Sequence, residues 1–284
     1  MIQSEKGGMA PTMPEYDWMK WFIEGNTSRS LIQAFRDLTC VRIHSQHQLV
    51  IATDSVGGIG MKAADAVRVL PEVVGYFALR VPLMEILAIG ATPFLVVNTQ
   101  CQTSDEYSDA ILHGMKMLAQ EVGMEERLQF NGSTEDNVPT IQTGVGVTVV
   151  GIVSDEKFYG GTIRAGQIAL VAGLPKSAPT HEIQVDDQEI LSIRDLQTLR
   201  SHPQVSDILP VGSKGILYEA NQLASTSGLS FQLEDSPISF TSSAGPSTCV
   251  VFACDEWGAI DVMRQITAPV TRIGTFIALD AKEE

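Results

Sequence analysis

An aspartate at the end of an apolar run, followed by a glycine-rich turn and a lysine, offers the clearest chemistry in the sequence. Residues 49–62 read LVIATDSVGGIGMK, and the apolar start predicts a buried strand that ends at Asp54. A carboxylate at the end of a strand is well placed to hold Mg²⁺. Glycines let the backbone approach phosphate oxygens and a lysine neutralises them, and this turn supplies Gly57, Gly58, Gly60 and Lys62. The segment indicates a nucleotide-phosphate site, and a plain turn after a strand is the alternative.

The net charge restricts the partners that this chain can bind. Its 284 residues include 34 acidic and 19 basic side chains, which gives a formal net charge of −15. A chain this acidic repels a nucleic-acid backbone, and the sequence holds no basic patch that would reverse the effect. We therefore expect no nucleic-acid partner. ATP stays compatible with the charge, because bound Mg²⁺ supplies positive charge.

The cysteines and the apolar runs predict a cytoplasmic protein without a membrane span. The four cysteines are widely spaced and form no CxxC pair, which argues against zinc or disulfides and fits a reducing cytosol. The most apolar stretch, residues 81–97, is interrupted by two prolines, a glutamate and a glycine. We expect a helix and a strand there, and no partner in a membrane.

Strand and helix patterns alternate in two halves, which predicts an α/β protein of two domains. The expected parts are an extension over residues 1–28, a first domain over 29–157, a linker over 158–166 and a second domain over 167–284. In the extension, Trp18, Trp21 and Phe22 share one face of a predicted short helix. That helix either packs on its own domain or contacts a second chain.

Local patterns predict the elements that position these segments. Helices are expected over residues 31–35, 71–89, 105–122, 189–201, 215–227 and 256–266. Strands are expected over residues 41–43, 49–53, 94–98, 128–130, 140–153, 167–173, 229–233, 248–253 and 271–279. Pro71 marks a helix start, and Pro82 predicts a kink in that helix.

Several short motifs follow one another in a characteristic order. The series runs ATDSVGGIGMK, EILAIGATP, FNGSTEDNVPT, GVGVTVVG, GQIALVAG, VGSKGILYEANQL and SAGPST. This order resembles the ATP-binding superfamily of aminoimidazole ribonucleotide (AIR) synthase, which includes thiamine-monophosphate kinase and selenophosphate synthetase. The resemblance implies a PurM-like fold of two α/β halves. It also implies a homodimer whose N-terminal halves form a joint β-barrel with helices outside, and an ATP site near the dimer interface where aspartates hold Mg²⁺.

The resemblance assigns metal ligands to three acids of the first half. Asp54 matches the acid that ends a Thr-Asp strand in the family. Glu85 stands where the family has an aspartate before a Gly-Ala-x-Pro turn, and its added methylene still permits metal ligation. Asp37 resembles the acid of an N-terminal Gly-Asp-Asp segment, although the preceding glycine is absent. Taken singly, Glu85 is explained as well by a surface acid or a partner of Arg80.

Two departures from the family pattern change the expected ligands. Asn131, Ser133 and Thr134 resemble a Gly-Gly-Asp/Glu-Thr segment that contacts the nucleotide, with Ser133 in place of the acid. Asp136 follows closely and is either a replacement metal ligand or a turn residue. In VGSKG of the second half, Lys214 stands where the family has an acid. We expect Lys214 to contact a phosphate, and a solvated lysine is the alternative.

The chain looks most like the α-ribazole kinase branch of the superfamily. It lacks the reactive cysteine of selenophosphate synthetase, the C-terminal cysteine of the hydrogenase-maturation protein and the signature of AIR synthase. This resemblance implies a kinase that uses ATP and Mg²⁺ to phosphorylate α-ribazole, a nucleoside salvaged in cobalamin biosynthesis. Two alternatives remain open. One is another ATP-dependent enzyme of the superfamily with a different substrate, and the other is a non-catalytic nucleotide-binding protein, which the missing acids favour.

Overall fold

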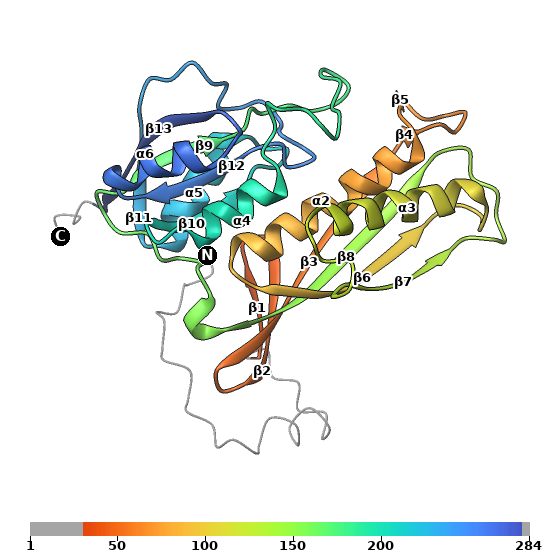
Figure 1. Cartoon of the computed structure of the whole chain (residues 1–284), viewed down its shortest axis with the longest axis horizontal. Helices are drawn as coiled ribbons and strands as arrows, with labels where there is room; N and C mark the ends of the chain where they lie inside the picture. Colours follow the sequence, from red (N-terminus) through yellow and green to blue (C-terminus); the bar gives the residue numbers. More distant parts are fainter. Residues whose placement is uncertain (1–30, 280–284) are drawn as a thin grey trace, which may run out of the picture.

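Two β-sheets with helices packed on them form the two halves of the chain (Figure 1). This computed structural model describes residues 31–279. In spatial order, the first sheet consists of β1 (Ile32–Phe35), β2 (Leu38–His44), β3 (His47–Gly57), β8 (Gly144–Ser154), β6 (Thr92–Gln100) and β7 (Gln129–Thr134). The second consists of β10 (Val205–Pro210), β12 (Val250–Cys254), β9 (Ile168–Ala172), β13 (Val270–Ala278) and β11 (Leu229–Leu233). A short parallel pair, β4 (Ile59–Gly60) and β5 (Val67–Arg68), follows β3.

Helices cover one face of the first sheet and both faces of the second. They are α2 (Pro71–Ala88), α3 (Glu106–Glu121), α4 (Ile193–Ser201), α5 (Ile216–Thr226) and α6 (Glu256–Gln265), with a 3₁₀ turn η1 (Asp155–Lys157) after β8. Helices α2 and α3 lie side by side over the first sheet, as Figure 1 shows. The buried residues of α4 and α6 share a core with one face of the second sheet, and α5 packs on the other face.

Side chains of β3 alternate between a helix-covered face and an open face, as the two-residue period of a strand requires. Val50 is fully buried on the face that α2 covers, whereas Leu49 and Ile51 belong to the other face. There Leu49 pairs with Ile152 of β8, and Ile51 pairs with Val150. Within residues 31–279 this sheet is open and not closed into a barrel. A barrel shared by two chains stays a prediction.

Helix α2 is buried over most of its circumference because other elements pack on it from several sides. It contacts the first sheet, α3, and the elements α4 and β10 of the second half. Pro71 opens the helix, and the helix continues through Pro82. Gly75 and Gly114 bring α2 and α3 into backbone contact. A Cβ on Gly75 would lie 1.8 Å from the carbonyl oxygen of Ile111, so no larger residue fits there.

Most predicted elements are confirmed, and so is the mixed α/β class. The helices expected over 71–89, 105–122, 215–227 and 256–266 are present as α2, α3, α5 and α6. Asp105 caps α3, because its side chain accepts hydrogen bonds from the backbone N–H groups of Tyr107 and Ser108. Helix α4 begins at Ile193, later than predicted, because Ser192 caps it.

One local prediction is wrong, and one strand of the second sheet is missed. Residues 31–35 form strand β1 and not a helix, because they pair with β2 across a two-residue turn. A short apolar run of this kind suits either structure, and the partner strand decides. The sequence patterns also miss β10, in which Ser206 and Asp207 interrupt the apolar run.

The described residues cover only some of the domain boundaries that the sequence predicts. The extension 1–28, with its aromatic residues Trp18, Trp21 and Phe22, lies outside the described residues. Residues 158–166 contain no helix or strand and connect the two sheets. Division of the chain into two folding domains stays a prediction.

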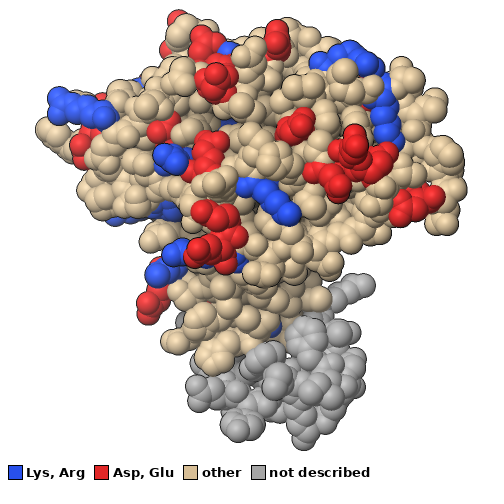
Figure 2. Space-filling model, turned by 45° about the vertical axis from the view of Figure 1, so that its right-hand side comes forward, with Lys and Arg blue, Asp and Glu red and all other residues tan. Residues whose placement is uncertain are grey.

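The described part of the chain offers neither a membrane span nor an extended basic surface on the face drawn in Figure 2. No helix within residues 31–279 is long and apolar enough to cross a membrane. On the face shown in Figure 2, acidic and basic side chains are interspersed over the surface, and no continuous basic patch is seen.

Candidate functional site

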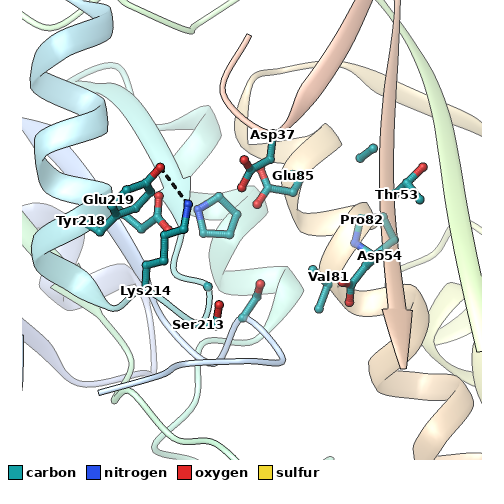
Figure 3. Close-up of a pocket in the computed structure, with 14 residues that line it drawn as sticks. Asp37, Thr53, Asp54, Val81, Pro82, Glu85, Ser213, Lys214, Tyr218 and Glu219 are labelled. Carbon is teal, nitrogen blue, oxygen red and sulfur yellow. Dashed lines mark hydrogen bonds between the residues drawn. The ribbon is translucent and has the colours of Figure 1, made fainter. Parts of the chain in front are cut away.

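A cavity of about 240 Å³ lies where the two halves meet (Figure 3). Its walls come from the β1–β2 turn, β3 and α2 of the first half, and from α5 and the segment before it in the second. Five charged side chains line it: Asp37, Asp54, Glu85, Lys214 and Glu219. Cavities that enclose a whole small ligand span roughly 300–1,000 Å³, so this one suits the charged end of a larger molecule.

Each acid of the pocket is positioned by a different element. Asp37 is the second residue of the two-residue turn between β1 and β2. Asp54 lies on β3, on the same face of the strand as buried Val50. Glu85 lies in the last turn of α2, and Glu219 lies in the first turn of α5 with only 5% of its surface exposed. Residues distant in the sequence therefore meet in one cavity.

Three of the pocket acids, Asp54, Glu85 and Glu219, have raised pKa values. Burial, followed by the negative charges of Asp37 and Glu219, raises the pKa of Glu85 to about 8. Burial and the charge of Asp37 raise the pKa of Glu219 to about 7. Burial also raises the pKa of Asp54. A cation in the cavity would relieve this repulsion and favour the ionised carboxylates.

Lys214 brings a positive charge to the wall formed by the second half. Its Nζ donates a hydrogen bond to the hydroxyl of Tyr218 at 3.0 Å and lies 4.2 Å from the centre of that ring (Figure 3). Gln222 Nε2 donates to the same hydroxyl oxygen at 2.8 Å. The hydrogen bond between Lys214 and Tyr218 raises the pKa of Lys214 and lowers that of Tyr218. Lys214 therefore stays charged beside the acids.

The start of α5 faces the pocket together with Lys214. Gly212 and Ser213 line the cavity just before the helix. Gly215 has φ +83°, and a Cβ there would lie 2.8 Å from the carbonyl oxygen of Phe240, so the chain needs glycine to enter α5 at this point. The unpaired N–H groups at the start of a helix favour an anion, and the lysine adds to that preference.

The acids fit a metal ion that arrives with a phosphate ligand. Within residues 31–279, no three His, Cys, Asp or Glu side chains converge closely enough to hold a metal on their own. Mg²⁺ does not require such a cage, because it usually takes one or two carboxylates, water and substrate phosphates. Asp37, Asp54 and Glu85 supply carboxylates of this kind. Their mutual repulsion is the observation that fits a cation.

The glycine-rich turn and Lys62 do not line this pocket. They lie beside β4, near the first residue of α2 and at the opposite end of that helix from Glu85 (Figure 1). Lys62 Nζ donates a hydrogen bond to Thr140 Oγ1 at 2.8 Å. Gly60 has φ +151°, and a Cβ there would lie 2.2 Å from the Tyr107 hydroxyl. Close packing thus explains this glycine, whereas Gly57 has open space around its Cβ position.

The predicted nucleotide contacts on β7 also lie outside the pocket. Asn131, Ser133 and Thr134 belong to this strand, which pairs in parallel with β6. Asp136 accepts a hydrogen bond from the backbone N–H of Ser104 at 2.6 Å. The predicted residues thus form two groups. One group meets in the pocket: Asp37, Asp54, Glu85 and Lys214. The ligand-binding roles of both groups stay predictions.

Glu219 and Tyr218 are pocket residues that sequence reasoning missed. Their signal is weak, because both lie in an ordinary amphipathic helix. One clue was available: Glu219 occupies the buried side of α5, where its neighbour Ala220 also lies, and an acid in such a position calls for a partner or a ligand.

A buried arginine ties the two walls of the pocket together. Arg80 of α2 is 1% exposed. It donates hydrogen bonds to backbone carbonyl oxygens of the second half: Leu191, Pro246 and Ser247. Ser247 itself lines the pocket. Because a guanidinium is costly to bury without acceptors, these contacts hold α2 against the second half.

The three first-half acids of the pocket lie in a segment that resembles a known family. Residues 35–153 match the family described as AIR synthase related protein, N-terminal domain. This range contains Asp37, Asp54 and Glu85. A comparison with curated protein sequences finds no significant match.

Several solved structures resemble nearly the whole chain in fold. Thiamine-monophosphate kinase from Stenotrophomonas maltophilia K279a is 16% identical, with a TM-score of 0.60 over 93% of this chain and 94% of that one. A structure described as AaThiL complexed with AMPPCP and TMP is 14% identical, with a TM-score of 0.62 over 96% and 94%. T. maritima PurL complexed with ATP is 14% identical, with a TM-score of 0.62 over 94% of this chain and 49% of that one. At these identities the likeness shows the fold alone.

Proposed function

We propose that this protein is an ATP- and Mg²⁺-dependent phosphotransferase of the AIR synthase superfamily. The observation that carries the proposal is the pocket, where acids from both halves face Lys214 and the start of α5. Positioning and charge neutralisation do most of the work in phosphoryl transfer. A cavity that combines carboxylates, a lysine and a helix start supplies both.

Proteins of the same fold support the use of ATP. T. maritima PurL is described in complex with ATP, and AaThiL in complex with the ATP analogue AMPPCP. The protein from Stenotrophomonas maltophilia is described as a kinase. In our proposal this chain also uses ATP, and the residues of its own pocket determine which reaction it catalyses.

The roles of the pocket residues follow from their charge and position. Asp37, Asp54 and Glu85 would hold Mg²⁺, which when bound neutralises phosphate charge. Glu219, on the opposite wall, adds a fourth carboxylate. Lys214 and the N–H groups at the start of α5 contact phosphate oxygens directly. Lys214 thus takes over neutralisation that an acid and a second metal would otherwise provide.

A homodimer belongs to the proposal, because the open face of the first sheet is apolar. Leu49, Ile51, Val150 and Ile152 lie on it as two cross-strand pairs. Ile152 is 38% exposed. Burial of such a face against a second copy is favourable. The glycine-rich turn and Lys62 lie away from the pocket of their own chain. In this proposal they therefore reach a nucleotide only if the nucleotide spans both chains of the dimer.

The proposed acceptor is the 5′-hydroxyl of α-ribazole. Its support is the resemblance of the motifs ATDSVGGIGMK and NGSTEDNVPT to the α-ribazole kinase branch. A different nucleoside or phosphate monoester is the second candidate within the same reaction class. A nucleotide-binding protein without catalysis is the third, favoured by Ser133 and Lys214 in positions where the family has acids.

The deciding experiment incubates the purified protein with ATP, Mg²⁺ and α-ribazole and follows phosphorylated product by mass spectrometry. We expect product that depends on Mg²⁺ and is lost in the Asp54→Asn variant. Turnover of ATP with another acceptor in a substrate screen would keep the phosphotransferase and replace the acceptor. ATP binding in calorimetry without Mg²⁺ dependence or turnover would establish the non-catalytic alternative.

A further inference from the structure

The turn between β1 and β2 sends two adjacent side chains into different parts of the molecule. Phe35 pairs with Leu38, so Arg36 and Asp37 alone make up the turn. Asp37 lines the pocket. Arg36 has φ +55°, a left-handed conformation that is uncommon for a residue with a side chain. A two-residue hairpin turn favours a positive φ at its first position, where glycine is usual, so contacts of the Arg36 side chain offset the cost of placing an arginine there.

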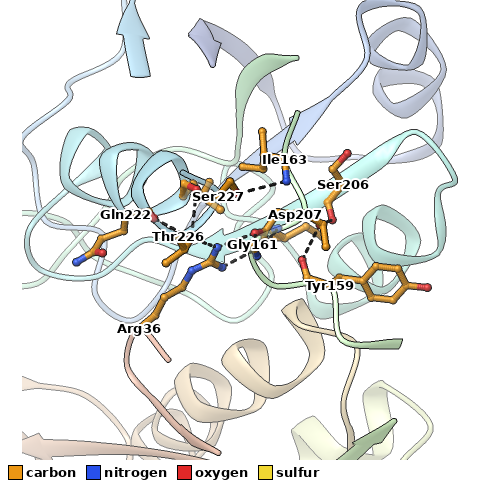
Figure 4. Close-up of polar contacts among 12 residues, drawn as sticks. Arg36, Tyr159, Gly161, Ile163, Ser206, Asp207, Gln222, Thr226 and Ser227 are labelled. Carbon is orange, nitrogen blue, oxygen red and sulfur yellow. Dashed lines mark hydrogen bonds and ion pairs between the residues drawn. The ribbon is translucent and has the colours of Figure 1, made fainter. Parts of the chain in front are cut away.

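The guanidinium of Arg36 is anchored in the second half (Figure 4). Nη1 and Nη2 donate to the two carboxylate oxygens of Asp207 on β10, at 3.0 and 2.6 Å. Nη2 also donates to Thr226 Oγ1 at 2.8 Å. The two charged side chains are 2% and 0% exposed, so the ion pair is removed from water.

Hydrogen bonds from the backbone hold the Asp207 carboxylate in position to bind this arginine. Besides the guanidinium, its carboxylate accepts hydrogen bonds at 2.8 Å from the backbone N–H groups of Gly161 and Ile208. Gly161 belongs to the segment that connects the two sheets. The β1–β2 turn, the connecting segment and β10 therefore converge on one carboxylate.

We propose that the Arg36–Asp207 ion pair positions Asp37 in the pocket. The pair fixes the β1–β2 turn against the second half, which sets Asp37 opposite Lys214 and Glu219. Arg36 is thus a positioning residue and touches no ligand itself. The use of Asp37 as a metal ligand rests on the proposed function, whereas the anchoring of the turn does not.

Contribution to stability alone does not explain this pair. A buried ion pair is often no more stabilising than apolar side chains of similar size, so β10 could have met the turn through apolar contacts. Bidentate geometry, in contrast, fixes the direction of a side chain as well as its contact. The residue so fixed is the immediate neighbour of a pocket acid.

The test separates positioning from stability with the double variant Arg36→Met/Asp207→Asn. Loss of Arg36 alone leaves a buried charge and destabilises the fold, whereas the double variant removes both charges and keeps an amide oxygen as an acceptor near the N–H groups of Gly161 and Ile208, so its unfolding temperature should move back toward that of the wild type. In the double variant we expect backbone amides of residues 35–39 to exchange hydrogen about tenfold faster, and Mn²⁺ to bind about tenfold more weakly in calorimetry. Asp37→Asn should weaken Mn²⁺ binding in the wild-type background and have little further effect in the double variant.

Arg42→Met/Asp155→Asn is the control, because Arg42 and Asp155 form an ion pair of 2.6 Å next to the same hairpin, more exposed than Arg36–Asp207 and without lining the pocket. We expect wild-type exchange at residues 35–39 and wild-type Mn²⁺ affinity. Equal effects of the two double variants, or wild-type exchange in Arg36→Met/Asp207→Asn, would overturn the proposal. A wild-type protein that binds neither Mn²⁺ nor ATP would count against the proposed function, and the exchange comparison would still decide the role of the ion pair.

Discussion

Glu85 at the end of α2 and Glu219 at the start of α5 stand on opposite walls of one pocket, and the charge of Glu219 helps to raise the pKa of Glu85 to about 8. The two residues are brought together only by the packing of the two halves. A carboxyl group placed in this way resists ionisation until a cation compensates it. The following predictions depend on that relationship and on the elements that create it.

The protein without metal should lose stability as the pH rises. The pKa of Glu85 is about 8 in the fold against an ordinary value of 4.5, so folding takes up a proton between these values. The free energy of unfolding therefore falls as the pH rises from 4.5 to about 8. Glu85→Gln should flatten this dependence, measured as the unfolding temperature from pH 5 to 8.5. The exposed Glu156 of η1 supplies the control variant Glu156→Gln, which should keep the wild-type slope. A wild-type slope in Glu85→Gln would contradict the prediction.

Asp54→Asn should abolish most phosphotransfer while the protein stays folded. Loss of a metal contact removes several kcal/mol of charge stabilisation, which predicts a decrease in kcat of roughly 100-fold or more. Steady-state kinetics at saturating Mg²⁺ measures the effect. Asp109→Asn on the exposed side of α3 is the comparison and should retain full activity. Equal rates for the two variants would show that Asp54 has no role in catalysis.

Lys214→Met should weaken ATP binding more than it slows turnover. A charged hydrogen bond to a phosphate contributes about 1.5–3 kcal/mol, so we expect KM for ATP to rise by roughly tenfold or more. Lys157→Met on the exposed turn η1 tests whether any lost positive charge has this effect, and it should leave KM unchanged. An unchanged KM in Lys214→Met would mean that Lys214 serves Tyr218 and not the nucleotide.

Ile152→Glu should separate the proposed homodimer without unfolding the chain. The side chain lies on the open face of the first sheet, where a carboxylate is tolerated by a monomer but would be buried unpaired in a dimer. Because such burial costs several kcal/mol, we expect the dissociation constant of the dimer to rise by roughly 100-fold. Light scattering after size-exclusion chromatography gives the mass. Ile260→Glu on α6 introduces the same charge at a residue that is 60% exposed, and it should leave the mass unaltered. A monomeric wild type would disprove the interface.

The sequence predicted the elements better than it predicted the pocket. Helices α2 and α3 carry their own signals, since Pro71 opens one and Asp105 caps the other. Strand β1 depends on its partner β2, so its short apolar run misled the prediction. β10 contains the polar residue Asp207 because Asp207 binds Arg36, which is 171 residues away in the sequence. No local sequence pattern reveals a partner at that distance.

For the candidate site, motif order identified the first-half acids and Lys214, which the structure brings together. It also grouped Lys62 and the glycines with Asp54 because they are adjacent in sequence. The strand β3 runs away from the pocket after Asp54, so the following turn is carried to the other end of α2. Glu219 was missed because its significance arises from burial, which only the packing of α5 reveals.

Helix α2 has a consequence for the kinetics of any ligand that enters the pocket. It packs on both halves, and Arg80 of this helix donates to carbonyl groups across the junction. A hinge motion between the halves would break those hydrogen bonds and the Arg36–Asp207 pair together. In the proposed function, we therefore expect ligand to enter and product to leave without domain closure. We expect association rates set by diffusion and by the charge of the ligand, with no slow conformational phase in stopped-flow traces.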